Sequence, residues 1–349
     1  MEYQNPRRTQ SDIISALPLN IIEHILTQMP LRDALRTSVL SKKWRYTWRS
    51  MPKLTFTDDM VKLPSNQCCG QLMKYKVAYA VFHVLLLHNG PIILEFRSLV
   101  GHLRLDSEFA PIISYLERGS KVKRLTFFHV KVPPQMLQQF LSKCPLLEYL
   151  CLIGSENGLD FVAGETKFTF FTFVDLFRCV PLIQTLDISE YYMKYLCAGG
   201  MPHKLPDSLV HLKYLFLDVC MAEKNEISAV LCMVTSSPLL EKIVFVMCDN
   251  EKLDHLETLE MNLDPQDYPD MKLDHLVSLW IEDFSNLPLE MEFVKLIMAK
   301  SPVLKKVRIE LNDNVSVDEE LEMLRDLVLH PIPRASPSAK LAIVRPKTC

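Results

Sequence analysis

The chain has 349 residues, 48% of them hydrophobic, and a formal net charge of −3 at pH 7. This length and composition allow one or two domains with a large buried core. A slightly acidic chain has no overall positive field that would draw it to nucleic acid or to an anionic membrane surface.

We expect neither a secretory signal nor a membrane span. The first twelve residues, MEYQNPRRTQSD, contain no apolar run. The longest apolar stretch, VAYAVFHVLLLHNGPIILEF from Val77, is broken by polar residues, glycine and proline, whereas a membrane span needs about 20 continuous apolar residues. The ten cysteines are scattered without a CxxC spacing, as is typical of buried, reduced thiols. This pattern favours a protein of the cytoplasm, the nucleus or both.

Residues 17–48 carry a dense set of apolar side chains on three short predicted helices. Pro18 suits the first turn of a helix, because the N–H that proline lacks has no helical partner there. Pro30 ends this helix, a second one follows from Leu31, and Ser41 can cap a third. The first helix carries an apolar stripe and the third carries two tryptophans: Ile21, Ile22, Ile25, Leu26, Trp44 and Trp48.

A unit of this size cannot hide all these side chains by itself. Below about 40 residues a chain rarely buries enough surface to be stable alone. Each Å² of apolar surface covered by a neighbour contributes roughly 25 cal/mol, so covering the whole stripe is strongly favourable. The segment therefore packs onto the rest of the chain or onto another protein.

Seven later segments share the pattern φ-x-x-φ-x-φ, where φ is an apolar residue, at spacings of 25 to 36 residues. Spacings of this size are typical of leucine-rich repeats. In four of the seven, the pattern follows a proline that comes shortly after a predicted helix. The first φ positions are Val122, Leu147, Ile183, Leu212, Leu240, Leu276 and Leu304.

The repeat of helix, proline turn and strand predicts an α/β solenoid, a curved parallel sheet backed by helices. Because side chains alternate along a strand, one residue in each repeat should be buried in the same position: Leu150, Leu186, Leu215, Ile243, Leu279 and Val307. The alternative is an ordinary α/β domain whose strands resemble one another by coincidence. The helix from Gln71 to His88 can cap the first repeat, and we expect the helix in SVDEELEMLRDLVLH to pack at the other end, with an inward face made of Val317, Leu321, Leu324 and Leu327 or Val328.

The same alternation places three large aromatic side chains, Tyr214, Phe216 and Trp280, on the outward, concave side of the strands. Aromatic residues are enriched among the anchors of protein interfaces. This pattern indicates a surface for a target protein. Alternatively, an insertion such as residues 189–206 or 247–270 folds over the three rings and buries them.

No catalytic constellation is present in the sequence. His83 and His88 do not share a helix face as an i, i+4 metal-binding pair does. The chain has nine glycines and no Gly-rich phosphate loop, and the basic run SKKWRYTWR lies inside a predicted helix. We therefore expect no enzyme activity, no cofactor, no metal, no nucleic-acid partner and no membrane partner.

The segment LPLNIIEHILTQMPLRDALRTSVLSKKWRYTW resembles the F-box. Together with the repeats, LLLHNGPIILEF and PRASPSAKLAIV, it makes the whole chain similar to plant F-box proteins of the leucine-rich-repeat and FBD class. In that family the F-box binds a Skp1-like adaptor, which connects to a cullin-RING ubiquitin ligase, and the repeats hold the target. By motif position the resemblance implies a set of residues that contact the adaptor or support those that do: Leu17, Pro18, Ile21, Ile25, Leu31, Val39, Leu40 and Trp44.

The expected organisation follows from the resemblance and the repeats together. It places an F-box at 10–50, a connecting region and N-terminal cap at 51–100, leucine-rich repeats at 101–311 with an FBD-like part from about 270, and a C-terminal helix and tail at 312–349. The expected function is substrate recognition in an SCF-type E3 ubiquitin ligase. One alternative is an interaction protein that uses the same adaptor without cullin-dependent ubiquitination, and a more remote one is an enzyme with an unfamiliar site.

Overall fold

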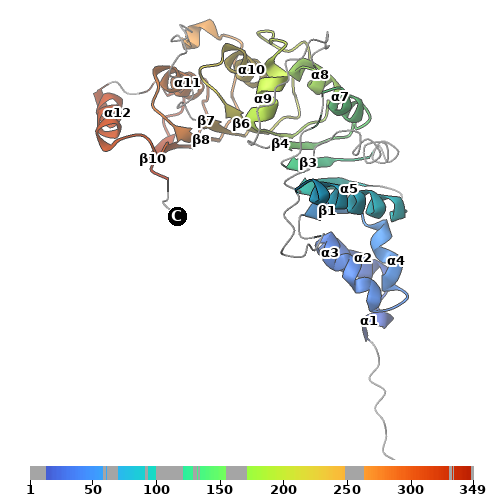
Figure 1. The fold of residues 1–349 in the computed structure, drawn as a ribbon. Helices are drawn as coiled ribbons and strands as arrows, with labels where there is room; N and C mark the ends of the chain where they lie inside the picture. Colours follow the sequence, from blue (N-terminus) through green and yellow to red (C-terminus); the bar gives the residue numbers. More distant parts are fainter. Residues whose placement is uncertain are drawn as a thin grey trace, which may run out of the picture.

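A computed structural model describes residues 13–57, 60, 70–90, 93–99, 121–128, 132, 134–154, 171–247, 263–329, 332 and 334–346. In these residues ten parallel strands form one sheet whose spatial order follows the sequence order. The sheet is curved, and a layer of helices covers its outer side (Figure 1). The strands are β1 (Lys53–Thr57), β2 (Glu95–Leu99), β3 (Arg124–Phe128), β4 (Tyr149–Ile153), β5 (Thr185–Ile188), β6 (Tyr214–Val219), β7 (Lys242–Met247), β8 (Ser278–Phe284), β9 (Lys306–Leu311) and β10 (Lys340–Val344).

The sheet confirms the predicted α/β solenoid and extends it by three strands. The seven φ-x-x-φ-x-φ segments form β3 to β9. Strand β10 has Ser338 in place of the first apolar residue of that pattern, and β2 has Ser98 in place of the last one, whereas β1 carries the complete pattern from Met51 and was not recognised. Each pairs in register with its neighbour, so the sheet continues beyond the recognised repeats at both ends.

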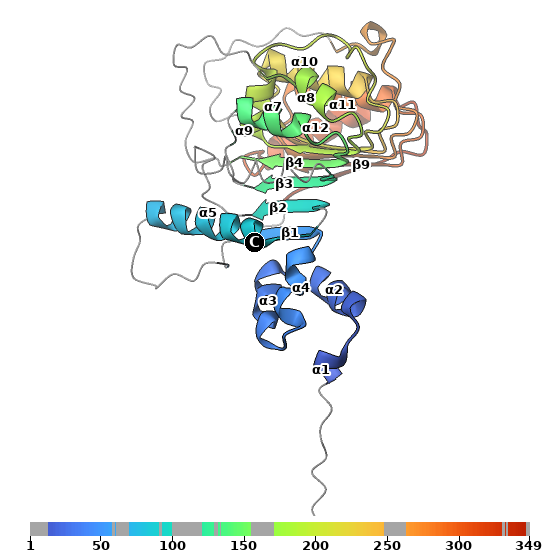
Figure 2. The ribbon, with the colours of Figure 1, turned by 90° about the vertical axis from the view of Figure 1, so that its right-hand side faces the viewer.

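Short helices form the N-terminal unit, which lies beyond the β1 edge of the sheet (Figures 1 and 2). As predicted, helices begin directly after Pro18 and after Pro30, and the backbone N–H of Trp44 donates to Ser41 Oγ at 3.4 Å at the start of the last helix. The helices are α1 (Ile13–Ala16), α2 (Leu19–Thr27), α3 (Leu31–Arg36) and α4 (Trp44–Thr47), with 3-10 turns at Thr37–Val39 and Trp48–Ser50.

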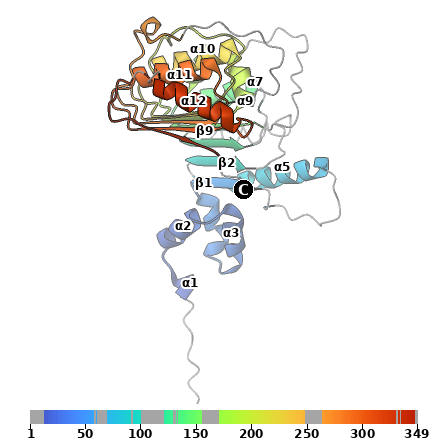
Figure 3. The same ribbon diagram turned by 90° about the vertical axis from the view of Figure 1, so that its left-hand side faces the viewer.

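The helices of the repeats form the outer layer, and Figures 1 and 3 show α7 to α11 over the same face of the sheet. Four of them end shortly before the prolines that the sequence marks as turns toward a strand. The helices after β1 are α5 (Gly70–Leu87), α7 (Pro134–Ser142), α8 (Phe173–Cys179), α9 (Glu190–Cys197), α10 (Lys224–Thr235), α11 (Pro288–Ala299) and α12 (Val317–Leu329), with a 3-10 turn at Pro265–Asp267. No helix in the described part of the chain is long and apolar enough to cross a membrane.

The strand register confirms the predicted common buried position. Leu150 pairs with Leu186, and the row continues across the neighbouring strands without a shift. Every member is at most 1% exposed: Leu150, Leu186, Leu215, Ile243, Leu279 and Val307. A second buried row runs two residues further along the strands, through Leu152, Ile188, Leu217, Phe245, Ile281 and Ile309. These two rows form the contact between the sheet and the helix layer.

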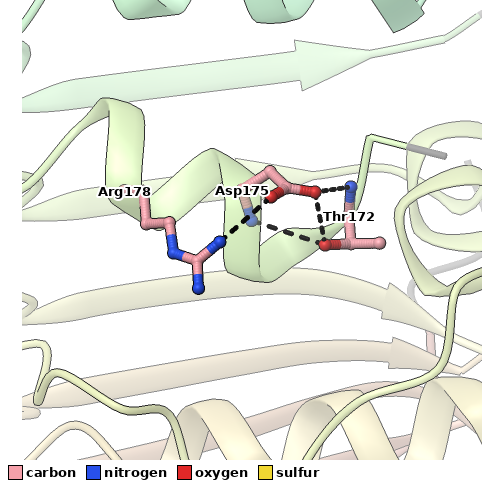
Figure 4. Close-up of polar contacts among 3 residues, drawn as sticks. All are labelled: Thr172, Asp175 and Arg178. Atoms are coloured by element: carbon pink, nitrogen blue, oxygen red, sulfur yellow. Dashed lines mark hydrogen bonds and ion pairs between the residues drawn. The ribbon is translucent and has the colours of Figure 1, made fainter. Parts of the chain in front are cut away.

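Carboxylates fix the start of several helices in the outer layer. In α8, the backbone N–H of Thr172 donates to Asp175 Oδ2 at 3.1 Å, and the backbone N–H of Asp175 donates to Thr172 Oγ1 at 3.4 Å (Figure 4). This capping box satisfies two backbone donors that a helix start leaves without partners. Arg178 lies one turn later and its Nη1 is 3.5 Å from Asp175 Oδ1 (Figure 4).

Two buried glutamates, one in α10 and one in α11, accept hydrogen bonds from backbone N–H groups just before these helices. Glu226 Oε2 accepts a 2.8 Å hydrogen bond from the backbone N–H of Cys220, and Glu290 Oε2 accepts bonds of 3.0 and 3.1 Å from the N–H groups of Ser285 and Leu287. Burial raises the pKa of Glu226 to about 8 and that of Glu290 to about 7. The strand-to-helix turns are therefore held by carboxyl groups that lie inside the protein.

The structure corrects the predicted orientation of the C-terminal helix. Val317 is 62% exposed in α12, and Leu321 and Leu324 are exposed as well. Leu327 does pack against the core, as predicted, but it does so together with Met323, on the face that also carries Glu320. Arg345 Nε donates to Glu320 Oε2 at 2.7 Å, so an ion pair with the segment after β10 holds this face inward.

We predict that Leu215→Ala destabilises the repeats by about 2–5 kcal/mol, because it leaves a cavity in the buried row. Urea unfolding followed by circular dichroism would measure the loss. The matched control is Leu239→Ala, which shortens an exposed leucine and should change stability by less than about 0.5 kcal/mol. Equal losses in the two variants would contradict the register.

We also predict that Glu226→Gln changes how stability depends on pH. The carboxyl group of Glu226 has a pKa of about 8 in the folded protein and an ordinary value of 4.5. Between these two pH values the unfolded chain releases a proton that the folded protein keeps, so the free energy of unfolding falls as the pH rises. The variant lacks this contribution, and its stability relative to wild type should rise from pH 5 to about pH 8.

Unfolding curves at several pH values would test this difference. Glu223→Gln serves as the control, because it removes an exposed carboxylate only three residues away. A difference between wild type and Glu226→Gln that stays constant with pH would refute the prediction.

Candidate interaction surfaces

The N-terminal helices expose several large apolar side chains. Val39 is 86% exposed, and five others in α1, in α2 and near the 3-10 turn at Thr37–Val39 are exposed too: Ile13, Ile14, Leu19, Ile21 and Leu40. Large contiguous apolar patches are rare on soluble monomers and mark interaction sites. We call these six residues the apolar patch.

The predicted adaptor residues divide into three groups by exposure. Pro18, Ile21, Val39 and Leu40 are exposed, and Leu17 and Ile25 are half-buried against the core. Leu31 and Trp44 are buried among the helices themselves. The structure adds three exposed apolar residues that the predicted set does not include: Ile13, Ile14 and Leu19. A sequence signal existed for the first two, since they are apolar and precede the helix that begins after Pro18.

Trp44 holds the beginning of the unit in place. Its indole Nε1 donates to the carbonyl oxygen of Ile14 at 3.1 Å, and the ammonium of Lys43 donates to the carbonyl oxygen of Leu17. These bonds tie α4 to the segment that carries part of the apolar patch. Trp44 therefore supports the patch from behind.

The N-terminal unit is joined to the first repeat through hydrogen bonds at the end of α5. The N–H groups of Asn89 and Gly90 both donate to the carbonyl oxygen of Arg49 at 2.9 Å, and His88 Nε2 lies 2.9 Å from the carbonyl oxygen of Met51. Burial lowers the pKa of His88, which favours the neutral ring. The buried core is also continuous from α2 through β1 to β3. The apolar patch thus has a fixed position relative to the sheet.

The inner, concave face of the sheet carries the predicted target residues. Helices α7 to α11 all lie on the other side of the sheet, so none of these described helices covers this face (Figure 1). Tyr214 is 37% exposed, while Phe216 and Trp280 are half-buried. Residues 190–197 of the first candidate insertion form α9 on the outer side, whereas 248–262 of the second lie outside the described residues.

Cations from neighbouring strands account for part of the burial of the rings. The ammonium of Lys242 lies 3.7 Å from the centre of the Trp280 ring and 5.5 Å from that of Phe216. The guanidinium of Arg308 lies 6.0 Å from the Trp280 ring. The hydroxyl of Tyr214 donates to Glu241 Oε2 at 3.3 Å. Aromatic and cationic side chains therefore form one mixed surface over β6 to β9.

A second group of polar side chains lies on the same face over β3 to β5. Arg124 covers the Tyr149 ring at 4.1 Å, and the Cys151 thiol donates to Asp187 Oδ2 at 3.3 Å. Burial raises the pKa of the Cys151 thiol and of the Asp187 carboxyl, and it raises the pKa of Tyr149 to about 12. A thiol with a raised pKa is a poor nucleophile.

Within the described ranges, no group of three or more His, Cys, Asp or Glu side chains could hold a metal ion. Two surfaces of the described structure are candidate interaction sites. One is the apolar patch, and the other is the concave face with its rings and cations.

Comparisons with known proteins agree with this organisation. The F-box domain family matches residues 14–56. The chain is 31% identical to an F-box/FBD/LRR-repeat protein of Arabidopsis thaliana, over 96% of this chain and 99% of that protein. It is also 52% identical to an F-box/LRR-repeat protein of Arabidopsis thaliana over 53% of this chain and 40% of that protein. An FBD-associated F-box protein of the same plant is 26% identical over 69% of this chain and 61% of its own length.

The similarity to the first relative extends over nearly the whole of both proteins, and the match to the F-box family covers the helices that carry the apolar patch. Strand order and register supply the repeat architecture independently. The chain therefore belongs to the F-box/FBD/LRR-repeat family of plants.

Proposed function

We propose that this protein is the substrate-recognition subunit of an SCF-type (Skp1–cullin–F-box) E3 ubiquitin ligase. In this proposal the F-box binds a Skp1-like adaptor and the concave face of the repeats binds the target protein. The observation that carries it is the apolar patch, exposed at one end of the molecule and fixed in position relative to an uncovered sheet face. Such a subunit holds the adaptor and the target protein at a fixed distance from each other.

The apolar patch supports the adaptor half of the proposal. Exposed side chains of this size are unfavourable in water, and a partner that covers them gains roughly 25 cal/mol for each Å² buried. We assign direct contact to the exposed and half-buried members of the predicted set: Leu17, Pro18, Ile21, Ile25, Val39 and Leu40. Leu31 and Trp44 act by holding the helices that present them.

The ligase subunit is proposed to act as a receptor and not as an enzyme, in the cytoplasm, the nucleus or both. The other candidate is an interaction protein that binds the adaptor without a cullin, and it needs the same apolar patch. Co-purification separates the two, because cullin recovered with the adaptor supports the ligase and adaptor alone supports the second candidate.

We predict that the F-box needs its adaptor. The chain expressed alone should be poorly soluble, and co-expression with a Skp1-like protein should rescue it. Ile21→Glu combined with Val39→Glu should weaken adaptor binding by about 2 kcal/mol or more, roughly a 30-fold increase in Kd, because it places charges in the interface.

Calorimetric titration of the adaptor would measure this effect, and Val210→Glu is the control because Val210 is an exposed apolar residue of the repeats. A soluble monomer without affinity for any Skp1-like protein would refute the proposed adaptor role. Unchanged affinity in the double variant would refute the assignment of the contact residues.

We further predict that Trp280→Ala keeps the fold and the adaptor but loses the target. The ring lies outside the buried rows, so its removal should cost little stability, whereas the loss of an interface anchor costs about 2 kcal/mol or more of binding. Proximity labelling in plant cells would compare this variant with wild type as full-length chains, with the proteasome inhibited so that targets accumulate and with the adaptor measured on the same samples. Val303→Ala is the control, since it changes an exposed apolar residue outside the strands. An unfolded repeat domain would show that Trp280 belongs to the core.

A further inference from the structure

A row of lysines crosses the concave face near the C-terminal end of the sheet. Lys242 pairs in register with Ser278, Ser278 with Lys306, and Lys306 with Lys340. Neighbouring strands lie about 4.8 Å apart, and like charges on directly opposite residues repel each other. Lys306 and Lys340 are such a pair, on the adjacent strands β9 and β10. The fold alone gains nothing from this arrangement.

Lysines near the beginnings of other strands have acidic partners on neighbouring segments. Lys123 forms a salt bridge with Glu148, Lys213 with Glu241 at 2.8 Å, and Lys53 with Glu95 at 3.7 Å. In contrast, no salt bridge joins Lys242, Lys306 or Lys340 to any residue in the described part of the chain. The three lysines of the row therefore have no carboxylate partner in the described part of the chain, although lysines beside other strands do.

Cationic side chains lie beside the aromatic rings. Lys242 lies 3.7 Å from the centre of the Trp280 ring and 5.5 Å from that of Phe216, and Arg308, which is paired with Glu310, lies 6.0 Å from the Trp280 ring. The two rings hold the Lys242 ammonium in place before any ligand arrives, so less side-chain freedom is lost on binding. A ligand bound at this row would contact the ordered ammonium of Lys242, the exposed ammonium groups of Lys306 and Lys340, and the ring of Trp280 beside them.

The opposite ends of the same strands are acidic. Glu282 and Glu310 lie on the concave side, four residues after Ser278 and Lys306, and Glu310 pairs with Arg308. Four residues of strand correspond to about 13 Å. A nucleic acid is negative along its whole length and would meet these carboxylates, whereas a protein segment can carry its negative charges at one end only. The charge pattern therefore favours a protein.

We propose that the concave face over β6 to β10 binds a segment of the target protein rich in Asp and Glu, whose carboxylates contact Lys242, Lys306 and Lys340 while an adjacent apolar side chain packs on Trp280. The inference rests on the proposed function only in naming the segment as part of the target. Acidic side chains supply the partners that the lysine row lacks within the protein.

Selection from a random peptide library tests this inference with the full chain bound to its adaptor. Crossing β6 to β10 covers roughly 20 Å, so an extended peptide of about ten residues is long enough. Peptides selected by the wild-type complex should be enriched in Asp and Glu next to an apolar residue. A selected peptide should bind at least about tenfold more weakly to Lys306→Glu/Lys340→Glu, and its affinity should fall as salt rises from about 50 to 200 mM.

The matched control is Lys123→Glu/Lys213→Glu, which makes the same change in net charge on lysines that already have acidic partners. It should leave the peptide affinity within about twofold of wild type, since both lysines form salt bridges with glutamates and neither belongs to the row on β7, β9 and β10. Equal weakening by both double variants would overturn the inference, because it would show attraction by overall charge.

Three other outcomes would also overturn it: selected peptides without acidic enrichment, no selected peptide at all, or tighter binding of a single-stranded RNA that depends on Lys306 and Lys340. The adaptor remains bound in every arm and can be quantified on the same samples. Loss of the acidic preference with the adaptor retained refutes this inference alone, whereas failure to bind any adaptor refutes the proposed function.

Discussion

The in-register pairing of neighbouring parallel strands is the constraint on which both sides of the repeat domain depend. Since side chains alternate along a strand, the row that contains Leu215 is buried only if the next row faces the opposite side. A slip of one residue would exchange the two rows and place Trp280 and Arg308 in the core. The buried leucines therefore also determine where the rings and the lysines lie. The energy of the core and the geometry of the binding face are set by the same register.

Carboxyl groups at the helix starts help to keep that register. Glu226 and Glu290 accept backbone N–H groups at the turns that lead from β6 into α10 and from β8 into α11, and Asp175 accepts the N–H of Thr172 at the start of α8. Burying a carboxyl group is unfavourable unless it is hydrogen-bonded or protonated, and the raised pKa of Glu226 and Glu290 reflects this cost. Glu226 Oε1 is buried without a hydrogen-bond partner in the described structure, which also fits a protonated group. These turns give each helix the same starting point above its strand, so that neighbouring helices align as neighbouring strands do.

The sequence was sufficient to predict the repeats, their register and the short N-terminal helices, because these depend on local periodicity and on proline. It did not separate exposed from buried members of the adaptor set: Leu31 and Trp44 occur in the same motif as Val39, and only packing between helices distinguishes them. The orientation of α12 depends on the ion pair between Glu320 and Arg345, which are 25 residues apart. The lysine row could not be recognised either, since Lys340 belongs to a strand without the repeat pattern. Each of these features depends on a contact between distant segments.

The junction between the F-box and the first repeat connects the two surfaces mechanically. Replacing Gly90 by any other residue would force neighbouring atoms to move, because the added Cβ would lie 2.9 Å from the His88 ring and 3.1 Å from the Ser50 backbone. Its N–H and that of Asn89 share one acceptor, the carbonyl oxygen of Arg49, so the chain segments approach closely at this point. A close, hydrogen-bonded contact backed by a continuous core resists rotation far more than a flexible linker does. In the proposed complex, a target held near β10 would therefore stand at a defined position relative to the adaptor on the F-box, at the opposite end of the solenoid (Figure 1).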